Sequence, residues 1–277
     1  MDTEIDNISN TTKCLNCGTE FEGDFCPKCG QNAETDRYTL RFIADNFVTA
    51  LSGKDGSIWF TLKSLFTRPG EMIVDNLNGK RKKYFSPFPM LFMVLTLYLL
   101  IVTLFNASIL DLVLEDFVPE LPADATIQEI KSHEVHRFLD SCLRFYYGHY
   151  TLSTIVTLPL AVMAARVCYG KNNRKRYYWA EYIVSIVYAT VIVILFRCLI
   201  KLFYPLEPDT FTTIGLLFSP LVAIVANTAC FRKMLGFSVA KTAWRSVLSR
   251  LLYFLMMATI LFFIMVIFAI HLAIKYQ

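Results

Sequence analysis

The sequence contains little charge for its length. Of its 277 residues, 18% are Asp, Glu, Lys or Arg, whereas soluble domains average about 25%. Hydrophobic residues account for 55%. This composition excludes an ordinary soluble fold and predicts an all-α membrane protein that crosses the bilayer several times. The net charge of +4 comes from basic residues in a few short segments, so it indicates membrane topology and not a surface that binds nucleic acid.

Motifs that carry catalytic chemistry are also missing. The sequence has no Gly-rich phosphate loop, no Ser-His pair and no paired carboxylates within its apolar segments. His133, Glu134 and His136 form the pattern HExH, which lacks the two histidines four residues apart that bind zinc in HExxH proteases. A solvated helix face is the simpler interpretation of these residues. We therefore expect that the protein is not an enzyme.

Residues 1–13 contain neither a basic start nor an apolar core of the kind found in secretory signals. We expect them to form a disordered tail that stays in the cytosol.

Four of the eight cysteines stand close together near the N-terminus. They form two CxxC pairs separated by eight residues, at Cys14, Cys17, Cys26 and Cys29. Two such pairs supply four thiolates, which zinc binds in tetrahedral geometry. A redox motif or two disulfides fit less well, because a redox CxxC stands alone at the start of a helix and a reducing compartment disfavours disulfides. The spacing predicts a structural zinc ribbon over 14–36, whose folding free energy comes from metal binding.

Five long apolar segments follow. The first, Pro87 to Phe105, has no charge over 19 residues, close to the ~20 that a helix needs to cross the hydrocarbon layer. The other four lie at about 150–168, 182–200, 211–230 and 251–274. Together they predict a five-helix membrane domain over 87–277. Five spans cannot be divided into the equal repeated halves that are typical of transporters.

Basic residues mark the same side of the membrane at every crossing. Cations beside short spans are retained in the cytoplasm. Fourteen lie at the ends assigned to the inside, the last being Arg250, and five lie in segments assigned to the outside. The N-terminus is therefore predicted in the cytosol and the C-terminus outside. This topology places the acidic segment 108–147 outside the cytoplasm. We expect it to be soluble and to contain a helix over 126–145.

The stretch 37–86, between the ribbon and the first span, is predicted to contain amphipathic helices. Apolar residues recur at helical spacing, which predicts three helices at 39–51, 58–66 and 71–79. The apolar side of the second helix is predicted to contain Ile58, Trp59, Leu62, Leu65 and Phe66. The second should end at the TRPG sequence of residues 67–70. Such helices rest in the cytoplasmic headgroup layer or cover the inner mouth of the bundle. A small soluble helical domain is the alternative.

Polar side chains inside the predicted spans are candidates for a function within the membrane. Arg197 lies three residues inside the end of the third span, where a charge at mid-depth would cost about 3 kcal/mol. We expect its side chain to snorkel to the outer headgroups, or else to pair with a buried partner such as Glu181 or with a polar group of another span. Asn227 and Thr228 are expected to form hydrogen bonds between helices.

Four consecutive cations, Lys80, Arg81, Lys82 and Lys83, precede the first span. They could bind anionic lipid, with a gain of about 1 kcal/mol for each cation. A simple role in orienting the span is sufficient to explain them.

The motifs of the N-terminal third resemble a bacterial family. CxNCG and FCPxCGQ are followed by LxxLFTRPGEMI, and then by GKRKKYFSPF where the first span begins. This order is similar to the family catalogued as domain of unknown function 3667, over about 14–105. The resemblance implies that the four cysteines bind zinc and that the junction carries a signature at Pro69, Gly70, Gly79, Lys80, Arg81 and Pro87. It implies no activity. The five-span topology also resembles that of Yip1-type membrane proteins.

These features together predict an integral inner-membrane protein with a non-enzymatic role. We expect a scaffold or sensor that lies in the lipid bilayer and whose cytosolic zinc ribbon docks a protein partner. The alternative is a channel, or a lipid- or solute-handling protein, with a path near Arg197 and Asn227.

Overall fold

The computed structural model describes residues 11–35, 37–41, 57–105, 118–119, 121–122, 125–170 and 177–276. In these residues a small two-stranded sheet is followed by eight helices. Five of the helices are long and apolar enough to cross a membrane: α5 (Pro87–Leu104), α8 (Tyr150–Gly170), α9 (Trp179–Leu202), α10 (Pro208–Leu235) and α11 (Val239–Lys275). The prediction of an all-α membrane protein with five spans is therefore confirmed.

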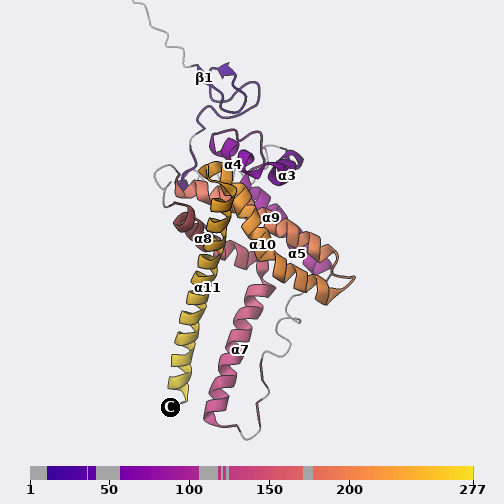
Figure 1. The fold of residues 1–277 in the computed structure, drawn as a ribbon, viewed down its shortest axis with the longest axis vertical. Helices are drawn as coiled ribbons and strands as arrows, with labels where there is room; N and C mark the ends of the chain where they lie inside the picture. The colour runs from indigo at the N-terminus through magenta and orange to yellow at the C-terminus, as the bar shows by residue number, and fades with distance from the viewer. Residues whose placement is uncertain are drawn as a thin grey trace, which may run out of the picture.

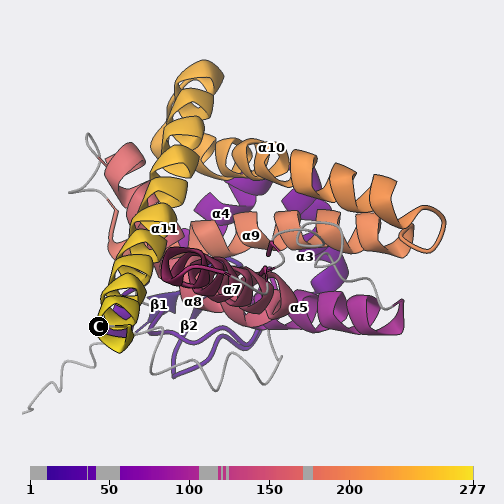
Figure 2. The same ribbon diagram turned by 90° about the horizontal axis from the view of Figure 1, so that it is seen from below.

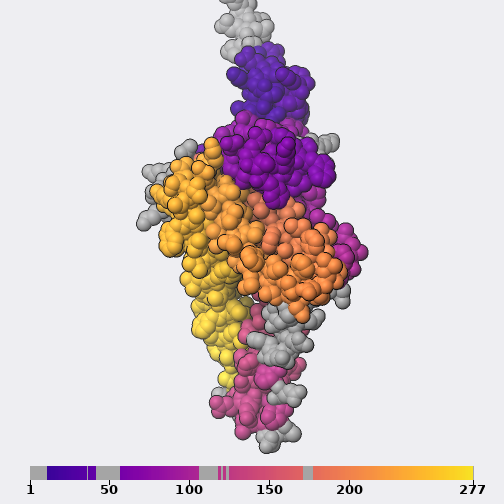
Figure 3. Space-filling view, turned by 45° about the vertical axis from the view of Figure 1, so that its right-hand side comes forward, coloured from indigo at the N-terminus to yellow at the C-terminus, as the bar shows by residue number. Residues whose placement is uncertain are grey.

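The ribbon lies at one end of the molecule, and two short helices separate it from the long ones (Figures 1 and 3). The ribbon contains strands β1 (Thr12–Lys13) and β2 (Glu20–Phe21), which pair antiparallel. The short helices are α3 (Ile58–Thr67) and α4 (Pro69–Leu77). We call α3 and α4 together the collar.

The break between the two collar helices is shorter than predicted. Arg68 alone separates them, and Pro69 is the first residue of α4 instead of part of a terminating turn. Proline suits this position, because the first helical residue needs no N–H donor and its φ is already helical. The helix predicted at 39–51 falls almost entirely outside the described residues.

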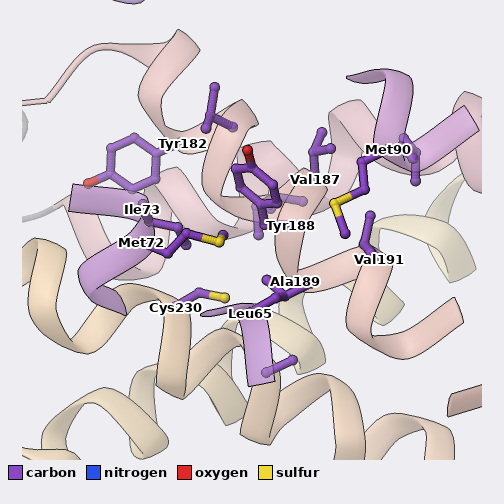
Figure 4. Packing of buried hydrophobic residues seen from close by; sticks show 14 of the residues in the cluster. Leu65, Met72, Ile73, Met90, Tyr182, Val187, Tyr188, Ala189, Val191 and Cys230 are labelled. Atoms are coloured by element: carbon purple, nitrogen blue, oxygen red, sulfur yellow. The ribbon is translucent and has the colours of Figure 1, made fainter. Parts of the chain in front are cut away.

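The collar shares its hydrophobic core with the long helices. Leu65 of α3 and Met72 and Ile73 of α4 are completely buried, in the same cluster as Met90 of α5 and Tyr188 of α9 (Figure 4). The collar thus covers the adjoining end of the bundle. This matches the prediction that the amphipathic helices cover the mouth of the bundle, and not the alternative in which they rest in the headgroup layer.

The buried face of α3 differs from the predicted apolar side. Trp59 and Phe66 were assigned to that side, but they are 81% and 61% exposed. Thr61 is buried in their place, because its hydroxyl oxygen accepts a hydrogen bond of 2.8 Å from the N–H of Phe85 at the junction with α5. Hydrogen bonding therefore fixes the rotation of α3.

Close packing joins the collar to α10 at Gly70. A Cβ atom at this position would lie 2.9 Å from both the carbonyl oxygen of Ala229 and the Cβ of Lys233. Only glycine allows α4 to approach α10 so closely.

Helix α9 lies at the centre of the bundle. It packs against α5, α8, α10 and both collar helices, and Figure 2 shows it flanked by α5 and α10. The hydroxyl of Tyr188 donates a 2.8 Å hydrogen bond to the carbonyl of Phe85. Helix α9 is thus tied to the point where the chain enters α5.

Helices α7 and α11 extend away from the rest of the bundle (Figure 1). The predicted helix at 126–145 is present as α7 (Ile127–Gly148), and a capping box formed by Thr126 and Glu129 fixes its start. The rings of Phe138 in α7 and Phe268 in α11 stack 4.0 Å apart. The polar helix α7 therefore lies along the apolar C-terminal half of α11.

Candidate metal centre and polar groups of the membrane helices

The two CxxC pairs form matching turns. The N–H of Gly18 donates to the carbonyl of Cys14, and the N–H of Gly30 donates to the carbonyl of Cys26, both at 2.8 Å. Both glycines have positive φ, 76° and 70°, a conformation that other residues rarely adopt. The repeated geometry explains why each pair is followed directly by glycine.

The turns bring the four cysteine sulfurs together. The Sγ atoms of Cys14, Cys17, Cys26 and Cys29 all lie within 4.8 Å of one another. The pairs Cys14–Cys29 and Cys17–Cys26 are each 3.5 Å apart, far longer than a disulfide of about 2.05 Å. Tetrahedral coordination with metal–sulfur bonds of about 2.3 Å requires sulfurs separated by roughly 3.8 Å. The four thiols can therefore hold a metal ion.

The sulfur environments differ between the members of one pair. Burial raises the pKa of Cys14 to about 11. A hydrogen bond with the Thr19 hydroxyl, 3.3 Å from Cys17 Sγ, lowers the pKa of Cys17 to about 6. A bound cation would favour the thiolate form of every ligand.

The ribbon is bound to the junction between α4 and α5 through the side chains of Gln31 and Leu15. Gln31 Oε1 accepts hydrogen bonds from the N–H groups of Arg81 and Lys82, at 3.3 and 3.5 Å. Leu15 lies against Gly79, whose φ is 94° and where a Cβ would be 2.6 Å from Leu15 Cδ1. The second cysteine turn and the junction before α5 are thus in direct contact.

The segment after the ribbon is bound to the start of α9. Arg37 donates two hydrogen bonds to Glu181, Nε to Oε1 at 2.9 Å and Nη2 to Oε2 at 3.0 Å. The carboxylate is only 2% exposed and also accepts from the N–H of Tyr178 at 2.6 Å. The Arg37 guanidinium lies 4.4 Å from the Tyr178 ring centroid. A fork of this kind is the strongest class of protein hydrogen bond.

This ion pair corrects one sequence expectation, in which Glu181 was considered as a partner for Arg197. Arg37 and Glu181 are 144 residues apart in the sequence, so no local spacing could indicate the contact.

Arg197 pairs with a polar group of another span, which was the alternative to snorkelling toward the outer headgroups. Its Nε donates a 3.0 Å hydrogen bond to Ser219 Oγ of α10, and its guanidinium lies 4.4 Å from the centroid of the Tyr150 ring. Arg197 lines a cavity of about 220 Å³ between α8, α9, α10 and α11. Arg250, predicted in an inner loop, instead lies within α11 and lines the same cavity.

The predicted polar contacts between helices are present at Thr228. Ser246 of α11 forms hydrogen bonds of 2.6 Å with the hydroxyl of Tyr169 in α8 and 2.8 Å with that of Thr228 in α10. Asn227 is buried but does not line the cavity that contains Arg197. Of these two residues, only Arg197 therefore lines the described cavity.

The cations before α5 are partly neutralised. Lys80 and Lys83 lie 2.7 and 3.4 Å from the carboxylate of Asp75 in α4. Burial alone would raise the pKa of Asp75. Hydrogen bonds from Lys80 and Tyr84 and the charge of both lysines lower the pKa by more than burial raises it, so it lies below its ordinary value. The side chain of Lys80 remains 40% exposed.

His133, Glu134 and His136 lie on α7, where His136 Nδ1 is 2.8 Å from the carbonyl of Ser132. Within the described ranges, the four cysteines form the one group of His, Cys, Asp or Glu side chains close enough to hold a metal ion.

Comparison with known proteins finds one similarity. The model of a family described as a protein of unknown function, DUF3667, matches residues 55–99. The matched segment includes the collar, the four cations and most of α5, so the resemblance inferred from the motifs is confirmed over this part of the chain. No curated protein and no solved structure matches the chain.

Proposed function

We propose that the chain is a non-enzymatic scaffold or sensor of the bacterial inner membrane, in which a zinc-bound cytosolic ribbon docks a protein partner. The observation that carries this proposal is the cluster of four sulfurs within 4.8 Å on a ribbon that is bound to the membrane helices. Zinc suits the site because four thiolates in tetrahedral geometry are the ligand set of structural zinc. With four protein ligands the ion has no open position for catalysis.

The contacts of the ribbon support a role in transmitting a signal or a mechanical force from a bound partner to the membrane helices. Gln31 and Arg37 connect the ribbon segment to the junction before α5 and to the start of α9. A partner that binds the ribbon would therefore act on two membrane helices. The side chain of Phe25, 63% exposed, is an apolar contact point available on the ribbon itself.

The distribution of cations supports a cytosolic position for the ribbon. Lys80 to Lys83 precede α5, Arg232 and Lys233 lie in the last turn of α10, and Lys241 lies near the start of α11. These ends adjoin the collar. Because cations beside short spans are retained in the cytoplasm, the ribbon would face the cytosol and five crossings would place the C-terminus outside.

Photo-crosslinking in intact cells tests this function. A photoreactive residue at Phe25 should capture a discrete protein partner. The adduct should be lost when Cys14 and Cys17 are both replaced by serine, because the ribbon then lacks its metal. The adduct should persist in the control variant Cys142→Ser, in which serine replaces a cysteine of α7 that is not part of the metal site. The same adduct in all three proteins, or purified protein without zinc, would contradict the proposal.

A second candidate is a lipid- or solute-handling protein. The observation that favours it is the cavity beside Arg197, which lies among four of the long helices.

A further inference from the structure

The cavity of about 220 Å³ lies among the long helices α8, α9, α10 and α11. Thr190 and Ser219, which line it, are close to the midpoints of α9 and α10. Tyr146 and Tyr147, in the last turns of α7, close one side. The cavity therefore reaches the middle of two of the five candidate spans.

The lining of the cavity is positively charged. It contains the guanidinium groups of Arg197 and Arg250 and no Asp or Glu, among the residues that the structure describes. Other lining side chains carry hydroxyl groups, including Tyr150 and Thr190. The hydroxyls of Thr154 and Ser219 already donate to carbonyls of their own helices. Charged side chains within membrane spans cost several kcal/mol and usually mark a functional site.

The two arginines are incompletely paired by protein groups. Arg197 uses Nε for Ser219 and stacks on Tyr150. Arg250 lies 5.4 Å from the ring centroids of both Tyr253 and Phe254, but its Nε is buried and has no hydrogen-bond partner in the described part of the chain. Buried N–H donors are normally satisfied.

A third cation lies beside this cavity. Lys201, one turn after Arg197 on α9, is 4% exposed, and its Nζ forms no hydrogen bond with any described residue. It lines a smaller pocket that shares Arg197 and Leu216 with the main cavity. Three cations thus line two adjoining pockets, and the described linings of both contain no Asp or Glu.

We propose that this cavity binds a phosphate group. Guanidinium groups bind phosphate oxygens through paired, charge-assisted hydrogen bonds, and two such groups line the cavity. A bound anion would neutralise the two arginines and satisfy Arg250 Nε. This site is separate from the ribbon and does not depend on the function proposed for it.

The phosphate can come from a phospholipid headgroup or from the solution. The cavity lining includes Phe254, which is 48% exposed on the apolar surface of α11. A phospholipid could therefore place its headgroup in the cavity and its chains along α11, whereas inorganic phosphate needs only the cavity.

Native mass spectrometry of the purified full chain tests the proposal. The protein is titrated in detergent with phosphatidylglycerol, with phosphatidylcholine of the same chains, and with inorganic phosphate. We expect one tightly retained phosphate-bearing molecule per chain. Replacing both Arg197 and Arg250 by glutamine should weaken its binding at least about tenfold, because charge-assisted hydrogen bonds are lost.

Arg245→Gln provides the matched control. Arg245 is five residues before Arg250 on the same helix, but it donates to the Tyr169 carbonyl and does not line the cavity. Its replacement should change binding less than twofold. If the double glutamine variant does not fold, Arg197→Lys with Arg250→Lys keeps both charges but removes the guanidinium fork, and should still weaken binding.

Each result decides the question. Retention of either phospholipid that is lost in the double variant identifies a lipid headgroup, and the same loss for inorganic phosphate identifies a soluble anion. Equal binding by wild type and a folded double variant would overturn the proposal, since it would assign binding to surface cations such as Lys80 to Lys83. Absence of binding for all three ligands would overturn it as well.

Discussion

Helices α9 and α11 are both strongly apolar, yet the protein uses them in opposite ways. Their most apolar stretches are similarly hydrophobic, but 56% of that stretch in α9 is buried and none of it in α11 is. Helix α9 has neighbours on every side. Hydropathy therefore predicts which segments cross the membrane, but not which of them lie inside the bundle.

The packing surface of α11 explains the difference. Its buried residues in the first half are Thr242, Ser246, Ser249 and Tyr253, which recur every three to four residues and form one polar stripe. Small and polar residues mediate helix contacts in membranes. Lipid chains are as apolar as leucine, so apolar side chains gain no hydrophobic free energy by packing against another helix. Helix α11 thus directs its polar stripe inward, and its large apolar side chains remain exposed on the surface.

The largest expected effect separates the two helices directly. Tyr188→Ala in α9 removes a fully buried ring and its hydrogen bond to Phe85, and should lower the free energy of unfolding by about 3–5 kcal/mol. Leu255→Ala in α11 truncates a side chain that is 63% exposed and should cost less than about 0.5 kcal/mol. Denaturant-induced unfolding in micelles measures both. Equal losses would show that α11 is buried by a further contact.

The sequence predicted those parts of the fold that depend on local pattern. The cysteine spacing indicated the ribbon, and uninterrupted apolar runs indicated five spans. Contacts between distant segments could not be predicted in this way. The pair Arg37–Glu181, the inward direction of Arg197 and the exposure of Trp59 depend on which helices become neighbours, and no periodicity within one segment contains that information.

A smaller effect tests how the start of α9 is held. Arg37→Ala leaves the buried carboxylate of Glu181 without its guanidinium and should cost about 1–3 kcal/mol. Hydrogen exchange should rise in residues 31–38 and 178–182 but not within α11. Lys28→Ala, an exposed change on the ribbon, is the control. Unchanged exchange in the Arg37 variant would show that the ribbon is not coupled to α9.

The polar stripe of α11 provides a still smaller effect. Ser246→Ala removes hydrogen bonds to Tyr169 and Thr228, and interhelical bonds in membranes contribute about 0.6–1.7 kcal/mol. Thr259→Ala on the same helix should be nearly neutral, because its hydroxyl donates only to the Leu255 carbonyl of its own helix. The same unfolding measurement compares the two. A larger loss for Thr259→Ala would contradict the assignment of the packing stripe.

The smallest effect concerns the collar, which covers α9 but not α11. The lowered pKa of Asp75 means that its contribution to stability is complete above the ordinary Asp pKa of about 3.9 and is lost as the pH falls through the lower folded value. Acid should therefore loosen the collar before it affects α11. Asp75→Asn should remove this part of the pH dependence, as followed by Trp59 fluorescence in a variant without the other tryptophans. An unchanged acid transition would exclude Asp75 as its source.

Hydrogen exchange before and after zinc chelation tests the central claim most directly, namely that metal holds the ribbon while packing holds the membrane helices. Zinc binding by such sites contributes on the order of 10 kcal/mol. The purified chain should contain one zinc ion, and chelation should remove protection from residues 14–31 and from the junction at 79–82, while residues 184–194 of α9 stay protected. A chain that contains no zinc, or an α9 that loses protection together with the ribbon, would contradict this account.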